Sequence, residues 1–153
     1  MGLDIFANIA GIQGESLDAT HKGEIEVLSC SWGVTNPVSA VPGSAVGRAT
    51  FQHLTFVHKI DKASPLLMQA CAESRRIQQA TITYRNAQQQ DYLIVKLNDV
   101  GITGITAGGA SGQAASETVS LVFATIALQY MPQKADGSLD AVVSFQYNLV
   151  AKT

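Results

Sequence analysis

The sequence has little charge and no concentrated run of one sign. Charged residues make up 14% of its 153 residues, and the ten basic ones are scattered through a chain of net charge −2. A typical soluble domain carries about 25% charged residues. Because no polycationic stripe is present, we expect no nucleic-acid partner. The shortage of charge indicates that neighbours cover part of the surface. A monomer kept in solution by Ser, Thr, Gln and Asn is the alternative.

The sequence also lacks long apolar runs and a basic leader. No apolar run approaches the roughly 20 residues that a membrane helix needs, so we expect no membrane insertion. The first residues, MGLDIFANIAG, have no basic segment and carry Asp4 within their apolar stretch, which argues against a Sec signal peptide. Phe6 stands where a myristoylation motif requires Ser or Thr. If the protein leaves the cell, another route exports it.

Cysteine is scarce as well. The two cysteines, Cys30 and Cys71, fall on a predicted strand and a predicted helix. Two thiols do not make a disulfide framework. We expect both to be small buried hydrophobic side chains, which is compatible with folding in the cytoplasm.

The chain length fits one domain over residues 1–153. A single helix of about ten residues is predicted near residues 64–74, with Ser64 as its N-cap and Pro65 at its first position. Alternation and β-branched residues predict strands over seven stretches, namely Leu3–Ala10, Glu24–Val34, Ala49–Lys59, Gln79–Asn86, Tyr92–Val100, Glu117–Tyr130 and Ala141–Leu149. This pattern predicts a mostly-β sandwich or barrel with one docked α-helix.

The stretch Gly14–Val34 joins a polar turn to a long strand with apolar groups on both faces. Alternation by twos separates two sets, with Glu24, Glu26, Leu28, Cys30 and Trp32 on one face and Ile25, Val27, Ser29 and Ser31 on the other. A strand that is apolar on both sides is usually covered on both sides, here by its own domain or by another subunit.

Two segments are predicted as loops. Thr35–Gly47 contains two prolines and two glycines, which exclude regular structure, and Gly101–Ser116 is rich in Gly and Ala. At about thirteen residues, the first reaches the length at which a structureless loop is often functional. An idle surface loop is the alternative interpretation.

The residue types that carry chemistry do not form a recognisable site. His53 and His58 are placed five apart on one predicted strand, so they point to opposite faces and cannot bind one metal ion. His21 lies near Ser16 and Asp18, the residue types of a hydrolytic triad. Three groups on one turn lack the separate elements that orient such a triad, and turns use these side chains to bond their own backbone. We predict no catalytic, cofactor or metal site.

Several blocks of the sequence resemble the haemolysin-coregulated protein (Hcp) family, the tube subunit of bacterial type VI secretion systems. They occur in order along nearly the whole chain, as GES and HKG from Gly14 to Gly23, EIEVLS with SWG from Glu24 to Gly33, DKASPL at Asp61–Leu66, ETVSL at Glu117–Leu121, and PQ with DG at Pro132–Gly137. Cys30 departs from the pattern, because relatives often have an aromatic residue there.

The resemblance implies a two-sheet β-barrel with a flanking helix that assembles as a homo-hexameric ring. Such rings stack into a hollow tube that a contractile sheath drives outward behind a spike protein. Family members hold effector proteins inside the ring, assemble in the bacterial cytoplasm and are exported without a signal peptide. In their single-domain form they are not enzymes.

Two groups of residues are candidates for these roles. For ring stacking we expect the Thr35–Gly47 loop, with Thr35, Asn36, Pro37, Val41, Pro42 and Gly43. For the lumen we expect Ser29 and Ser31, which are small and polar, to face a cavity and contact cargo. The alternative function, from another class, is a monomeric β-barrel that binds a small ligand, or a hydrolase built on His21.

Overall fold

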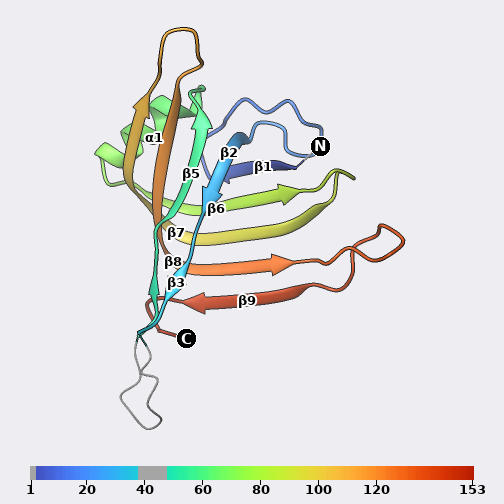
Figure 1. Cartoon of the computed structure of the whole chain (residues 1–153). Helices are drawn as coiled ribbons and strands as arrows, with labels where there is room; N and C mark the ends of the chain where they lie inside the picture. The colour runs from blue at the N-terminus through green and yellow to red at the C-terminus, as the bar shows by residue number, and fades with distance from the viewer. Residues whose placement is uncertain (1–2, 38–47) are drawn as a thin grey trace.

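The computed structural model describes residues 3–37 and 48–153 (Figure 1). Over these residues the chain forms nine strands and one helix, in the order β1 (Asp4–Ile9), β2 (Ile25–Ser31), β3 (Val34–Thr35), β4 (Thr50–Phe51), β5 (Leu54–Lys59), α1 (Ala63–Ala72), β6 (Arg76–Arg85), β7 (Asp91–Gly108), β8 (Ser116–Tyr130) and β9 (Val143–Asn148). No helix in this part of the chain is long and apolar enough to cross a bilayer.

Six strands close into a barrel. The main sheet has the order β5-β2-β1-β6-β7-β8-β9, and β5 also pairs with β8, so that β9 alone lies outside the closed ring. Every strand pair is antiparallel. The mostly-β barrel with one flanking helix is therefore confirmed. The barrel is one continuous sheet, and the second sheet is a small arm of β3 and β4 at its lower end (Figure 1).

The long strand β8 makes both closure and extension possible. Its residues 116–121 pair with β5 and its residues 125–130 pair with β9, while β7 follows it along both halves. The predicted loop at Gly101–Ser116 is therefore wrong as far as Gly108, because this stretch continues β7. Gly101 suits this place, since a Cβ there would lie 3.2 Å from Arg76 and 3.3 Å from Val122. The connecting turn is confined to residues 109–115.

The barrel interior is an apolar core that also encloses one buried histidine–glutamate pair. Alternate residues of the six barrel strands point inward along much of their length and are almost completely buried, among them Phe56, Ile82, Leu97 and Leu121. Burying each such side chain contributes about 1.5–3 kcal/mol relative to leaving it in water. Because side chains fill it, the interior of the barrel is a core and not a channel.

Helix α1 packs against β7 and buries Ala63, Leu67 and Ala70. Its predicted start is shifted, because Ser64 lies inside the helix. The Asp61 carboxylate accepts the Ala63 N–H at 2.9 Å, and the Ser64 hydroxyl accepts the Asp61 N–H at 3.1 Å. This reciprocal pair satisfies backbone groups that a single N-cap at Ser64 would have left open.

A bulge in β2 changes which residues face the core. The register with β5 shifts between Val27 and Ser29. Ile25 and Val27 are buried, but beyond the bulge Cys30 and Trp32 pack against the core. The predicted faces are therefore correct up to the bulge and reversed after it, because the extra residue shifts the alternation by one position. Cys30 and Cys71 are partly buried free thiols, and burial raises the pKa of Cys30 to about 11.

Candidate functional site

The turn that follows β1 folds back on the outside of the barrel. We call residues 14–24 the anchored loop. At its base the Gly14 N–H donates to the Gly23 carbonyl at 2.8 Å, and the Ser16 N–H donates to the Glu24 carbonyl at 3.0 Å. A Cβ at Gly14 would lie 2.7 Å from the Glu24 carbonyl oxygen and from the Ile25 Cα, so only glycine fits this close approach.

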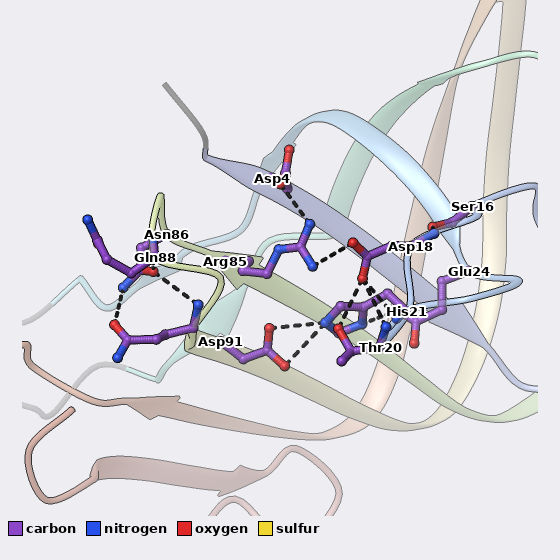
Figure 2. Close-up of polar contacts among 11 residues, drawn as sticks. Asp4, Ser16, Asp18, Thr20, His21, Glu24, Arg85, Asn86, Gln88 and Asp91 are labelled. Carbon is purple, nitrogen blue, oxygen red and sulfur yellow. Dashed lines mark hydrogen bonds and ion pairs between the residues drawn. The ribbon is translucent and has the colours of Figure 1, made fainter. Parts of the chain in front are cut away.

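Arg85, at the end of β6, fixes the first half of the anchored loop. Its side chain is buried and donates from Nη1 to Asp18 Oδ1 at 2.7 Å and from Nη2 to Asp4 Oδ2 at 2.9 Å (Figure 2). The guanidinium also lies 4.9 Å from the centre of the Phe6 ring. The hydrogen bond from Arg85 lowers the pKa of Asp18 to about 2. One cation therefore joins the loop to β1 and β6.

His21 fixes the second half. Its ring stacks on Phe6 with ring centres 4.4 Å apart. Its Nδ1 lies 3.0 Å from Glu24 Oε1 and its Nε2 lies 3.0 Å from Asp91 Oδ1 (Figure 2). Ionised carboxylates only accept hydrogen bonds, so the two contacts together require both ring nitrogens to donate, as in an imidazolium. Burial of the ring opposes its protonation, but Asp91 and Glu24 outweigh this effect and raise the pKa of His21.

This geometry does not assemble the hydrolytic triad that the turn suggested. The Ser16 hydroxyl accepts the Asp18 N–H at 3.2 Å, and Asp18 accepts the backbone N–H groups of Thr20 and His21. Both nitrogens of His21 are already occupied by carboxylates. Ser16, Asp18 and His21 thus organise the turn and its attachment to the barrel, as the local interpretation predicted.

A second histidine lies inside the barrel. His58 and Glu117 face each other across the β5–β8 seam, with Nε2 2.8 Å from Oε1, and both are completely buried. The other ring nitrogen of His58 lies 3.8 Å from Asp61 Oδ1. Burial is the main cause that raises the pKa of Asp61. His53 lies before β5, not on it as predicted, and meets the Thr103 hydroxyl at 3.1 Å.

Those lumen and stacking candidates that the structure describes lie on the outside of the barrel. Ser29 and Ser31 are exposed on β2. Thr35 pairs with Thr50 in the arm, and Asn36 and Pro37 follow it. The other stacking candidates, Val41, Pro42 and Gly43, lie outside the described residues. Their roles in stacking and cargo binding stay predictions.

Two surface features were not predicted from the sequence. The first, which we call the leucine patch, surrounds Glu26 with Leu3, Leu17 and Leu28, whose exposed fractions are 70%, 87% and 56%. The second, which we call the arm cavity, has a volume of about 560 Å³. It is lined by the arm and the C-terminal segment, through Asn36, Arg48, Ala49, Thr50, Phe51, Tyr147, Leu149 and Lys152. Each surface joins three separate segments of the sequence, so no local pattern marks either.

Comparison with known proteins places this arrangement in a family of secretion proteins. Residues 6–130 match the family model described as "Type VI secretion system effector, Hcp". The chain is 38% identical to Protein hcp1 of Pseudomonas aeruginosa (strain PAO1) over 156 residues, which cover 97% of this chain and 96% of that protein.

Solved structures agree over the same length. Hcp1 from Salmonella typhimurium is similar with a TM-score of 0.86 and 34% identity, covering 100% of this chain and 99% of that one. A type VI secretion system effector from Yersinia pestis is similar with a TM-score of 0.81 and 34% identity, covering 95% and 99%. The chain therefore belongs to the Hcp family of structural proteins of the type VI secretion system.

Proposed function

We propose that this chain is the tube subunit of a type VI secretion machine. Six copies form a ring, rings stack into a hollow tube, and the lumen carries effector proteins. The sheath and spike of the machine are its further partners. Residues 1–153 act as one domain without enzymatic activity, assemble in the cytoplasm and leave the cell with the cargo. The observation that carries the proposal is the match to Hcp proteins over essentially the whole chain.

The exposed surface supports self-association. Beyond the leucine patch, Val143 and Phe145 on β9 are 64% and 45% exposed. In the described part of the chain, the outer edge of β9 pairs with no strand. An open edge with exposed apolar side chains is a surface that proteins usually cover. A contact between two different surfaces of one chain can repeat around an axis and close into a ring.

The oligomeric state tests the proposal directly. Light scattering on the purified protein should give a mass six times the 16.2 kDa of one chain. Negatively stained particles should be rings with an open centre. A monomer at every concentration would contradict the tube function and favour the alternative of a ligand-binding barrel. In the part of the chain that the structure describes, side chains fill the barrel and carboxylates occupy both nitrogens of His21, and neither arrangement favours that alternative.

The lumen proposal for Ser29 and Ser31 has its own test. Ser31 is exposed on β2, so Ser31→Gln adds bulk without disturbing the core. We expect rings of the same size that retain less effector protein when purified together. Ser111→Gln, in the exposed turn between β7 and β8, is the matched control. Unchanged cargo retention in Ser31→Gln would remove Ser31 from the lumen while leaving the ring in place.

A further inference from the structure

The leucine patch has a carboxylate at its centre, that of Glu26. Glu26 is exposed on β2, opposite Phe6 of β1, and lines the same surface hollows as Leu28. Among the described residues Glu26 has no hydrogen-bond or ion-pair partner within the chain, unlike Asp4 and Asp18, which line the same hollow and pair with Arg85. The patch therefore combines a protruding leucine with a free carboxylate.

The arm cavity has the opposite character. Its floor is aromatic and aliphatic, where Phe51 packs against Tyr147 with ring centres 5.0 Å apart. Arg48 and Lys152 line it, and no carboxylate does. In the described residues neither cation has an acidic partner within 4.0 Å. The sequence of residues 38–47 contains no Asp or Glu that could supply one.

We propose that the leucine patch of one copy inserts into the arm cavity of the next copy. Leu28 packs on Phe51 and Tyr147, and Glu26 lies between Arg48 and Lys152. The proposal rests on the proposed ring assembly and names the surfaces that make its subunit contact. Opposite charges that meet across an interface fix its register and exclude wrong partners. A cavity of this volume is within the range that accepts several side-chain groups.

The placement of the two surfaces suits a repeating contact. Leu28 lies in the middle of β2, whereas the arm begins where the same chain continues into β3 (Figure 1). The patch and the cavity thus occupy separate regions of one copy, and each remains available when the other is occupied. Such a contact is heterologous, and its repetition generates a ring or a filament.

Charge reversal tests the contact in the full chain. Glu26→Lys places a cation against Arg48 and Lys152, and the double variant Arg48→Glu/Lys152→Glu places two anions against Glu26. We expect each variant alone to need at least about tenfold more protein for half-assembly, because like charges face each other across the contact. An equimolar mixture of the two should assemble as the unchanged chain does, since every contact then pairs opposite charges.

Controls separate this proposal from the ring itself. Glu73→Lys makes the same charge change on the exposed end of α1 and should leave assembly unchanged. Circular dichroism checks the fold of each variant, and Leu28→Ser should also weaken assembly without adding charge. If the unchanged chain is monomeric, the proposed function fails. If it forms rings but the reversed variants assemble equally well, or the mixture does not recover, this contact is overturned and the ring stands.

Discussion

Two histidine–carboxylate groups in this molecule have similar hydrogen bonds and different surroundings. His21 lies on the outside, under a surface loop, where Asp91 is 38% exposed. His58 lies in the barrel interior, where neither it nor Glu117 has any exposed side-chain surface. In the first group water can solvate a carboxylate that loses its partner. In the second group an unpaired charge stays in a medium of low dielectric constant.

The two groups therefore have different structural roles: one attaches a surface loop, and the other holds the strand pair that closes the barrel. His21, together with Arg85, attaches the anchored loop to strands that are already paired with each other. His58 and Glu117 belong to the strand pair that turns an open sheet into a barrel. We therefore expect damage at His58 to unfold the whole barrel and damage at His21 or Arg85 to release the loop.

The largest effect should come from Glu117→Ala. This change leaves His58 buried without its partner and creates a cavity, so we expect the free energy of unfolding to fall by about 3–5 kcal/mol. Urea denaturation followed by circular dichroism measures it. The double variant His58→Leu/Glu117→Met removes both polar groups at similar volume and should recover most of the loss. A cost below about 1 kcal/mol for the single variant would show that the pair does not hold the seam.

An intermediate effect is expected for Arg85→Met. The variant keeps an apolar stem over Phe6 but loses the charge-assisted hydrogen bonds to Asp4 and Asp18, at a cost of about 1–2 kcal/mol. Amide hydrogen exchange should become faster in residues 14–24 and stay unchanged in β7 and β8. Arg76→Met is the matched control, because the Arg76–Asp99 pair is more than half exposed and should contribute under about 1 kcal/mol. Equal exchange in the loop for both variants would contradict the role of Arg85.

The strands and the helix could be predicted because their signals are local. Alternation located β1, β6 and β8, and apolar spacing located α1. Two errors came from local exceptions. The bulge after Val27 reversed the expected faces, and the glycines after Val100 looked like loop although β8 holds them in a strand by pairing. A partner strand can override weak intrinsic preference, and a single sequence does not reveal that partner.

The contacts of the site could not be predicted for a related reason. His21 meets Asp91 across 70 positions, and Arg85 meets Asp4 across 81. The sequence predicted that Ser16, Asp18 and His21 share one turn, and the structure has that turn. No residue near them in the sequence indicates that the turn contacts β6 and β7. The motifs of the Hcp family predicted the fold and the family. These motifs do not indicate that a buried arginine pairs with two acids from different segments.

The smallest effect concerns the pH dependence of the anchored loop. Because Asp91 and Glu24 raise the pKa of His21 above its ordinary value of 6.5, the stabilisation is complete below 6.5 and is lost as the pH rises through the raised value. Because Asp91 is 38% exposed, solvent screens its pairing with His21, so we expect less than about 1 kcal/mol. Hydrogen exchange of residues 14–24, corrected for the intrinsic pH effect, should show the loop loosening as the pH rises above 6.5. In His21→Gln the neutral side chain cannot titrate, so the corrected exchange should not vary over that interval. A loop that instead tightens as the pH rises would mean that the folded protein binds fewer protons than the unfolded chain, so that the His21 ring is neutral in the fold and the assigned imidazolium is wrong.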